Sequence, residues 1–444
     1  MNLDPKLIDK IYNAFDPFET LQPGDPAYVD CADVRGDSNI KQDLGKKILR
    51  TDNSTCHLYA GHRGVGKSTE LARLKKYLED NNCFVVYFSA DQEDIDSEDA
   101  QYTDILLACT RHLLQDLRKT NPDLILHWLR DRWRDLQDLS LTTVKLDSLN
   151  VEAAIATFAK ITANLRAEPT QRAKIRELVN PHTTTLLQAL NHFINEAQNE
   201  LPLGKTTLVV IADSLDRIVP IIQEDGRTNH DRIFIERSQQ LKSLECHVIY
   251  TVPISLLYSS RANDLYDNYG DTTILPMIMV QNPDAESTNY TPGLDKIKEI
   301  IKARITKIQP DINLETQIFE DLNVLEKICL MSGGHVRQLM QLIQEAINNI
   351  DEFPITNKAA RRSITKLRDV YRRTIEEDQW QLLAEVSRDK ELENSDEYRE
   401  LLFNRCLLEY VYFDAEGELK RWCDVHPLIK DIPKFQQVYQ QVQQ

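Results

Sequence analysis

Residues 61–68 read Gly-His-Arg-Gly-Val-Gly-Lys-Ser and match the pattern G-x-x-x-x-G-K-[S/T] in full. Three of the 13 glycines in the chain fall within this segment, so the match does not come from a glycine-rich composition. Residues 55–60 before it predict a short strand, and Leu71, Leu74 and Leu78 after it predict a helix with one apolar face. A glycine loop in this position lets backbone N–H groups turn around phosphate oxygens, with the positive end of the helix aimed at the same anion. The segment therefore predicts a phosphate-binding loop in an α/β protein.

The same segment supplies most of the residues that we expect to bind ATP. Lys67 would neutralise the β- and γ-phosphates, and the Ser68 hydroxyl would ligate Mg²⁺. We therefore expect ATP and Mg²⁺ as the cofactors. The predicted ATP-binding residues are Gly61, His62, Arg63, Gly64, Val65, Gly66, Lys67, Ser68 and Thr69.

A second part of the site is predicted by the apolar run Leu208–Asp213, which ends in a carboxylate. A buried strand that ends in Asp places the carboxylate at the carboxyl edge of a parallel sheet, where Mg²⁺ bound to the phosphates would lie. We expect Asp213 to be the second magnesium ligand beside Ser68. Asp216, three residues later, is the candidate for orienting or deprotonating the attacking water. The alternative that Asp216 caps the next helix or pairs with Arg217 remains open.

Composition and charge limit the class of protein. The chain has 444 residues, more than one hydrophobic core usually organises, and 41% of them are hydrophobic. The formal net charge of −17 repels phosphate backbones at long range, so binding of nucleic acid would need a local basic face. None of the eight cysteines lies within three residues of another, which excludes a CxxC zinc or redox motif.

Two features of the sequence argue against a signal peptide and a membrane span. Residues 1–18 mix charges into their apolar positions, unlike a signal peptide. The longest apolar runs, at 208–212 and 274–280, are too short to span a bilayer. We therefore expect a cytoplasmic protein with no membrane partner.

Strands alternate with helices along the chain, which favours a parallel sheet with helices on both faces. Besides 55–60, strands are predicted at 83–89, 207–212, 246–251 and 272–280. The predicted fold is α/β: a P-loop sheet with a helical insertion, a helical lid and a C-terminal winged-helix-like module. The expected divisions are an N-terminal helix and linker (1–24), the P-loop core (25–285, with the insertion at about 100–201), the lid (286–355) and the terminal module (356–444).

Four segments together resemble the AAA+/STAND branch of P-loop ATPases, particularly its bacterial NACHT-like and initiator-like members. They are GHRGVGKSTEL at 61–71, VVIADSLDRI at 209–218, VIYTVP at 248–253 and SGGHVRQL at 332–339. The resemblance spans about residues 25–345. It implies that Thr251 is a sensor of the γ-phosphate at the end of its strand, and that Arg337 reaches the same phosphate from the lid. The alternatives are a strand residue of no special role for Thr251 and a surface cation for Arg337.

The resemblance also implies that Tyr28–Val29 and Val34–Gly36 pack against adenine. The sequence departs from many AAA+ members at Ser214, where a catalytic Glu would stand. The Asp-x-x-Asp arrangement is closer to the NACHT pattern and implies slow turnover, as in a switch rather than a motor. No arginine finger can be chosen among Arg217, Arg232, Arg237 and Arg261.

Residues 361–373 (RRSITKLRDVYRR) predict a helix with six basic residues on one arc and an apolar stripe on the other. This arc is either a phosphate contact or a solvated face paired with Glu376, Glu377 and Asp378, and the second interpretation is favoured. Two helices, near 380–386 and 396–406, and two strands, at 407–413 and 419–425, follow in winged-helix order. The acidic turn 414–418 would repel DNA, which favours docking to a protein.

These features predict an ATP-hydrolysing conformational switch. Analogy with relatives of this organisation suggests stress or defence signalling, a protein effector as partner, and self-association through the ATPase domain. The alternative is an ATP-gated, DNA-binding initiator or loader, with nucleic acid possible but not favoured. A scaffold that binds nucleotide and scarcely hydrolyses it is a third possibility. His426, Trp128 and Trp133 are expected to be structural.

Overall fold

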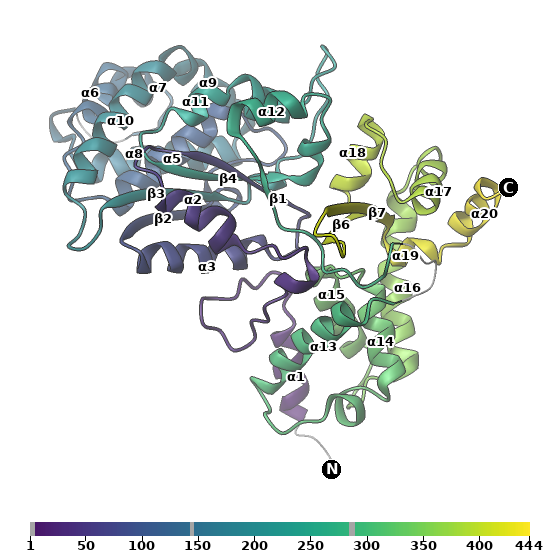
Figure 1. Ribbon diagram of the computed structural model, residues 1–444. Helices are drawn as coiled ribbons and strands as arrows, with labels where there is room; N and C mark the ends of the chain where they lie inside the picture. Colours follow the sequence, from purple (N-terminus) through teal and green to yellow (C-terminus); the bar gives the residue numbers. More distant parts are fainter. Residues whose placement is uncertain (1–4, 143–145, 284–288) are drawn as a thin grey trace. The chain divides into compact units, whose positions relative to one another are not determined.

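The computed structural model describes residues 5–142, 146–283 and 289–444 (Figure 1). The expected boundary between core and lid, at residues 285 and 286, lies outside these ranges. The described chain forms two compact units. One contains residues 40–60 and 73–273 and is called here the sheet unit. The other contains residues 1–39, 61–72 and 274–444 and is called the lid unit.

The sheet unit is built on a five-stranded sheet with the strand order β2-β3-β4-β1-β5, which confirms the predicted α/β fold (Figure 1). Neighbours β2 and β3 are parallel, as are β3 and β4. The strand β3 is buried along nearly its whole length, which explains its continuous apolar run. The strands are β1 Cys56–Gly61, β2 Cys83–Ser89, β3 Thr207–Asp213, β4 His247–Pro253 and β5 Thr273–Ile274.

Helices and short helical turns surround this sheet. In chain order they are η2 Lys41–Gly45, α2 Lys46–Leu49, α3 Lys67–Asp80 (beyond Ala72), α4 Ala90–Glu93, α5 Tyr102–Asp116, α6 Asp123–Asp131, α7 Trp133–Asp138, η3 Leu146–Ser148, α8 Val151–Ala167, α9 Pro169–Val179, η4 Asn180–His182, α10 Thr183–Asn199, η5 Leu215–Arg217, η6 Asp231–Glu236, α11 Ser238–Lys242, η7 Ile254–Tyr258 and α12 Ala262–Tyr269.

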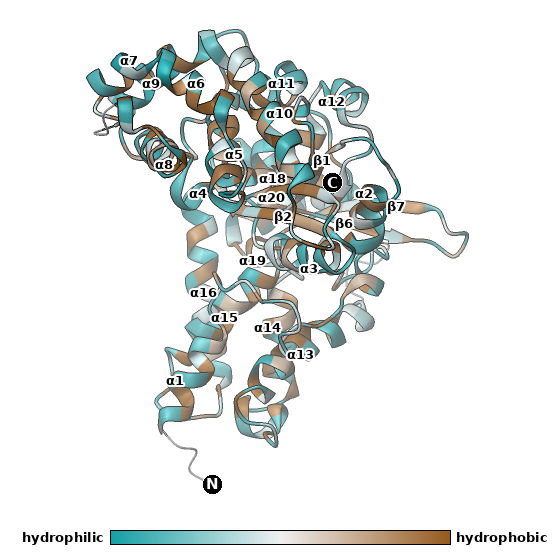
Figure 2. Ribbon diagram, turned by 90° about the vertical axis from the view of Figure 1, so that its left-hand side faces the viewer, coloured by the Kyte–Doolittle hydropathy of each residue, from teal (hydrophilic) through white to brown (hydrophobic). Residues whose placement is uncertain are grey.

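The predicted insertion between β2 and β3 is helical, comprising α5 to α10. Polar and apolar stretches alternate along α6, α8 and α10, as expected for helices that bury one face (Figure 2). Arg172 and Arg176 of α9 both bind Asp99, with Nη1–carboxylate distances of 2.9 and 2.8 Å. Arg176 also pairs with the buried Asp104 of α5 at 2.6 Å. Because these guanidinium groups are nearly buried, the ion pairs fix α9 against α5 more firmly than surface pairs would.

The lid unit contains the N-terminal helix, the lid helices and the C-terminal module. Its elements are α1 Pro5–Ala14, η1 Ala32–Val34, α13 Thr291–Thr306, η8 Leu314–Ile318, α14 Leu322–Met331, α15 Val336–Ile347, α16 Asn357–Thr374, α17 Gln379–Asp389, α18 Asp396–Phe403, β6 Leu407–Phe413, β7 Leu419–Val425, α19 Pro427–Lys430 and α20 Pro433–Val442. The strands β6 and β7 are antiparallel. The elements α17, α18, β6 and β7 follow one another in the order expected from the sequence (Figure 1), and a winged-helix-like module stays a prediction.

The strand predicted at 272–280 is wrong over most of its length, because β5 contains only Thr273 and Ile274. The residues after it are buried but pair their backbone elsewhere. Met279 N–H donates to the Val34 carbonyl at 3.1 Å, and the Val280 carbonyl accepts from Tyr290 N–H at 2.9 Å. An apolar run thus signals burial here without specifying a strand partner. Among the described helices, none combines the length and apolarity needed to cross a membrane.

Candidate nucleotide-binding site

The phosphate-binding loop predicted at 61–68 joins β1 to α3 in the structure. The loop backbone favours glycine at Gly64 and Gly66 among other positions. Gly64 has φ +90°, and a Cβ there would lie 2.8 Å from the Cβ of Arg337. Gly66 has φ +112°, and a Cβ there would meet no atom within 4 Å, so its conformation alone favours glycine. The sequence pattern therefore corresponds to backbone geometry and to close packing against the lid.

Lys67 is the first residue of α3 and is only 5% exposed. Its ammonium donates to the carbonyls of Gly61 at 2.7 Å and His62 at 3.0 Å. The positive charge is thus held by the backbone of the loop itself, where an anion bound to the loop N–H groups would meet it. Ser68 and Thr69 follow in the first turn of the helix and are half-buried.

The segment before the loop packs on it within the lid unit. The buried guanidinium of Arg35 donates to the Val65 carbonyl at 3.0 Å. The Tyr28 hydroxyl donates to the Glu70 carboxylate at 3.0 Å, and Leu21 N–H donates to the Thr69 hydroxyl at 3.3 Å. The residues that the resemblance places near adenine therefore lie beside the loop. An adenine contact itself stays a prediction.

The lid contacts the loop through two residues of the predicted sensor segment. His335 Nδ1 accepts from Gln338 N–H at 3.0 Å at the start of α15. Its Nε2 therefore carries the proton and donates to the Arg63 carbonyl at 2.7 Å. Arg337 N–H donates to the Gly64 carbonyl at 3.1 Å. Burial, together with the charge of Arg405, lowers the pKa of His335 well below its ordinary value, so this imidazole is neutral.

The side chain of Arg337 contacts the N-terminal segment. Its Nε donates to the Pro17 carbonyl at 3.1 Å, and its guanidinium carbon lies 5.5 Å from the centre of the Phe18 ring. The backbone N–H of Arg337 thus contacts the loop, while its guanidinium lies over the Phe18 ring. The sensor role remains a prediction.

The C-terminal module also contacts the loop, which sequence reasoning missed. Glu409 N–H of β6 donates to His62 Nε2 at 3.1 Å. The Arg63 guanidinium lies over the Phe403 ring of α18 at 4.2 Å and donates to the Phe403 carbonyl at 3.4 Å. Burial lowers the pKa of His62 to about 3, consistent with a neutral ring that accepts from a backbone N–H. No spacing signal in the sequence links residues 62 and 409.

Asp213 and Thr251 lie on neighbouring strands of the sheet unit. Ala212 of β3 is opposite Tyr250 of β4, and Asp213 and Thr251 are the next residues along the two strands. Asp213 is 2% exposed and accepts from the Tyr87 hydroxyl at 2.8 Å and from Ser214 N–H at 2.6 Å. The Thr251 hydroxyl accepts from Leu215 N–H at 3.0 Å. Thr251 therefore anchors the turn that follows Asp213.

Asp216 lies in that turn, the 3₁₀ helix η5, and is 5% exposed. The turn is entered through Ser214, whose φ of +66° is left-handed. The hydroxyl of Ser214 bonds that of Ser89 at 2.8 Å, and Arg217 forms an ion pair with Asp91. The strand β4 lies between β1, which leads into the loop, and β3, which ends at Asp213.

The four candidates for an arginine finger each have a partner within the sheet unit. Arg217 pairs with Asp91, Arg232 with Asp225, Arg261 with Asp264 and Glu236, and Arg237 lies over the Tyr102 ring. A role as a finger for a second chain would require each to leave its partner.

Magnesium fits the donor set that the sequence predicts. The Ser68 hydroxyl and the Asp213 carboxylate are hard oxygen donors, which Mg²⁺ prefers alongside phosphate and water. In the described ranges, no group of three or more His, Cys, Asp or Glu side chains is placed to hold a metal ion. His426 is buried, accepts from Leu428 N–H at 3.2 Å and packs on Tyr371, which is a structural arrangement. Trp128 is 3% exposed and stacks on Phe158, as a core residue does.

The basic face predicted at 361–373 is present on α16. Its acidic partners differ from those expected: Lys366 pairs with Glu345, Arg368 with Asp431, and Arg372 with Asp369. Lys358, Arg361 and Arg362 are exposed, and within the described chain no carboxylate lies within 4.0 Å of them. They line a shallow groove together with Lys366 and Arg372. The face is therefore only partly neutralised.

No protein-family model matches this sequence, and no curated protein matches it. The structure is similar to that of the Orc1 protein of Aeropyrum pernix in complex with DNA, with a TM-score of 0.40 and 10% identity over 97% of this chain and 96% of that one. Cdc6p from Pyrobaculum aerophilum gives a TM-score of 0.38 and 11% identity, with 100% of each chain covered. A Walker-type ATPase of Pyrococcus abyssi gives 0.36 and 13%, over 96% and 99%.

These names correspond to the initiator-like part of the resemblance and not to its NACHT or STAND part. All three TM-scores lie below 0.5, so neither function nor site residues are inferred from them.

Proposed function

We propose that the chain is an ATP-hydrolysing P-loop ATPase in which nucleotide at residues 61–69 controls the lid and the C-terminal module. The observation that carries this proposal is that loop residues 62–64 bond α15 on one side and β6 and α18 on the other. A change in the loop on binding phosphate would act directly on the lid helix α15 and on the C-terminal module.

Each predicted residue has a distinct task in this proposal. Lys67 and the loop N–H groups bind the β- and γ-phosphates, and Arg337 turns toward the γ-phosphate from the lid. Ser68, in the first turn of α3, and Asp213, the last residue of β3, are the residues that would hold Mg²⁺, as the sequence predicts. The bound Mg²⁺ neutralises charge on the phosphates. Asp216 orients the attacking water, and Thr251 fixes the turn that carries Asp216.

The size of the expected coupling follows from the contacts. The hydrogen bonds from His335 to Arg63, from Arg337 to Gly64 and from Glu409 to His62 each contribute about 0.5–1.5 kcal/mol net. If nucleotide binding broke two of these bonds, the free energy that holds the lid or the C-terminal module against the loop would change by about 1–3 kcal/mol. This is the usual range of allosteric coupling. By reciprocity, a partner that holds the module in place would change ATP affinity by the same factor.

The experiment compares phosphate release and ATP binding in the wild type, Lys67→Ala and Asp216→Asn. We expect ATP binding to be lost in Lys67→Ala, and turnover but not binding to be lost in Asp216→Asn. Normal hydrolysis by Asp216→Asn would refute its catalytic role. Binding without any phosphate release in the wild type, alone or with partners, would instead identify a nucleotide-bound scaffold.

Nucleic acid is the partner that one specific observation favours. Lys358, Arg361 and Arg362 leave positive charge on α16 in a protein of net charge −17. We therefore propose an ATP-gated contact with DNA, as in the initiator or loader alternative, in preference to stress or defence signalling through a protein effector. The acidic turn at 414–418 speaks against contact through the wing itself.

The DNA proposal is tested by its salt dependence. Affinity of the wild type for duplex DNA should fall steeply between 50 and 200 mM salt, about tenfold or more, as phosphate contacts release counterions. The double variant Arg361→Gln, Arg362→Gln should weaken binding and reduce the salt slope, while Arg388→Gln, which removes an exposed arginine paired with Asp389, should not. Absence of DNA binding at low salt would remove this proposal and leave a protein effector.

Self-association through the ATPase domain also stays a prediction, which sedimentation with and without ATP would test.

A further inference from the structure

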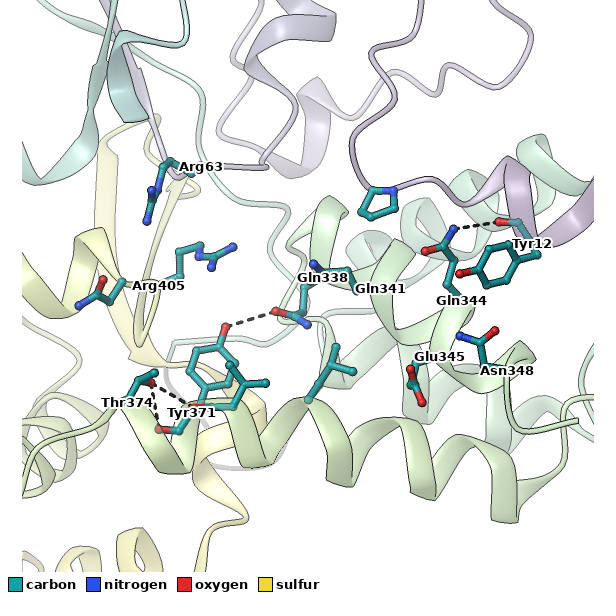
Figure 3. A pocket seen from close by; sticks show the side chains of 14 residues that line it. Tyr12, Arg63, Gln338, Gln341, Gln344, Glu345, Asn348, Tyr371, Thr374 and Arg405 are labelled. Atoms are coloured by element: carbon teal, nitrogen blue, oxygen red, sulfur yellow. Dashed lines mark hydrogen bonds between the residues drawn. The ribbon is translucent and has the colours of Figure 1, made fainter. Parts of the chain in front are cut away.

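A cavity of about 560 Å³ in the lid unit has no role in the function proposed above. It lies between α1, the lid helix α15, α16 and the residues that follow α18 (Figure 3). Figure 3 shows Arg63 and Arg405 at one end of the cavity, Gln338 and Gln341 in the middle, and Tyr12, Gln344 and Asn348 at the other end. A volume of this size is within the range of sites for small organic ligands.

The charged end of the cavity is unusual because Arg405 has no acidic partner. No carboxylate in the described part of the chain lies within 4.0 Å of its guanidinium, and its Nε is buried without a hydrogen-bond partner. Glu345, the carboxylate among the described lining residues, is bound to Lys366 at 2.7 Å. Burial and then the charge of Arg405 lower the pKa of His335. A partly buried cation without an anion is costly, and a bound anion would remove that cost.

The backbone at Arg405 supports a selected role for this side chain. Arg405 follows α18 with φ +62°, a left-handed position at a helix C-terminus where Gly or Asn is favoured. Its N–H bonds the Leu402 carbonyl at 3.1 Å, so the strained conformation is part of the helix end. A long cation in such a position costs about 1–2 kcal/mol relative to glycine. The side chain brings a guanidinium to the same end of the cavity as Arg63.

The rest of the cavity wall offers hydrogen-bonding and apolar groups to the part of a ligand beyond its anionic group. Side-chain amides of Gln338, Gln341 and Gln344 follow one another along α15 at helical spacing and offer both donors and acceptors. Gln338 is 5% exposed and accepts from the Tyr371 hydroxyl at 3.3 Å. Tyr371 and the apolar side chains of Leu367 and Val370 form the opposite side. Two guanidinium groups, a row of amides and an aromatic wall match a phosphate that carries a planar, hydrogen-bonding group.

We propose that this cavity binds a small phosphorylated ligand of the nucleoside 5′-monophosphate class, at a site separate from the P-loop nucleotide. The phosphate lies between Arg63 and Arg405, which bind such oxygens through paired N–H groups. The base and sugar lie along the amide row toward Tyr12. Because Arg63 belongs to the loop and its carbonyl accepts from His335, an occupied cavity holds the loop against the lid. The ligand is thereby an effector of the ATPase.

The test is calorimetric titration of the full-length chain carrying Lys67→Ala, in which the P-loop no longer competes. The probes are the four nucleoside 5′-monophosphates, adenosine and inorganic phosphate. We expect at least one monophosphate to bind with a Kd below about 1 mM, and adenosine to bind at least about tenfold more weakly. Arg405→Gln should weaken the monophosphate at least about tenfold, and Gln341→Trp, which fills the cavity from a half-buried position, should abolish it. Arg388→Gln should bind as the parent does.

Two results would overturn the proposal: no monophosphate binds at millimolar concentration, or both Arg405→Gln and Gln341→Trp leave binding unchanged. Inorganic phosphate binding as tightly as the nucleotide would refute the part that assigns a nucleoside. Since these titrations lack a working P-loop, they succeed or fail independently of ATP binding by the wild type.

Discussion

Gly64→Ala tests the contact between the phosphate loop and the lid. A Cβ at this position would lie 2.8 Å from both the Cβ of Arg337 and the Cε1 of His335. Carbon atoms pack at about 3.5 Å or more, so the lid would have to move by about 0.7 Å or the loop would have to deform. Overpacking of this kind costs about 1–3 kcal/mol. The left-handed backbone at φ +90° adds about 1–2 kcal/mol for any residue with a Cβ.

Gly66→Ala is the matched control for this change. Gly66 lies in the same loop with φ +112°, but its Cβ would meet nothing within 4 Å. The control therefore carries the backbone cost alone, about 1–2 kcal/mol. The difference between the two variants isolates the packing of the loop against Arg337 and His335, which we expect to be about 1–3 kcal/mol.

Two assays measure the effect. Urea denaturation gives the free energy of unfolding of each variant, and hydrogen exchange reports local opening of α15. Gly64→Ala should be the less stable variant and should exchange faster over residues 336–347, because the bonds from His335 and Arg337 to the loop are lost. Equal stability and equal exchange in the two variants would refute the close contact and, with it, the coupling of loop to lid.

Three further predictions concern the chemistry and the buried polar groups. Asp216→Asn should retain ATP binding while its rate of phosphate release falls about a hundredfold or more, and a rate near that of the wild type would contradict the assignment. Thr251→Val removes the acceptor of Leu215 N–H and should lower the free energy of unfolding by about 1–3 kcal/mol, whereas Thr251→Ser should restore it. Folding lowers the pKa of His62 and of His426 from 6.5 to about 3. Each buried neutral imidazole therefore contributes its full stability above pH 6.5, and this contribution is lost progressively as the pH falls below 6.5. Between pH 7 and 5 each should cost about 2 kcal/mol in urea denaturation, and an unchanged acid slope in His62→Gln would count against the buried neutral ring.

The central part of the fold could be predicted from local sequence because its signals are local. The loop follows its strand and opens its helix within a dozen residues, and the run Leu208–Asp213 is buried on both faces. Such patterns depend on the period of apolar residues and on the conformational freedom of glycine. The strands β6 and β7 were predictable for the same reason, with a turn between two β-rich runs.

The parts of the fold and site that were not predicted depend on contacts between residues far apart in the sequence. The spacing of residues along the chain carries no information about such contacts. The buried run after Ile274 reads as a strand, but its backbone pairs with Val34 and Tyr290 rather than with a neighbouring strand. The bond from Glu409 to His62 joins positions 347 residues apart. The partners of the α16 basic face lie on α15, at Asp431 and on α16 itself at Asp369, not in the acidic residues that follow the helix.

Calorimetric titration of the wild type with ATP and Mg²⁺ tests the central claim most directly. The account predicts saturable heat corresponding to one nucleotide per chain at the P-loop, and loss of this heat in Lys67→Ala. A wild type that releases no heat, or a Lys67→Ala variant that binds as tightly as the wild type, would contradict it.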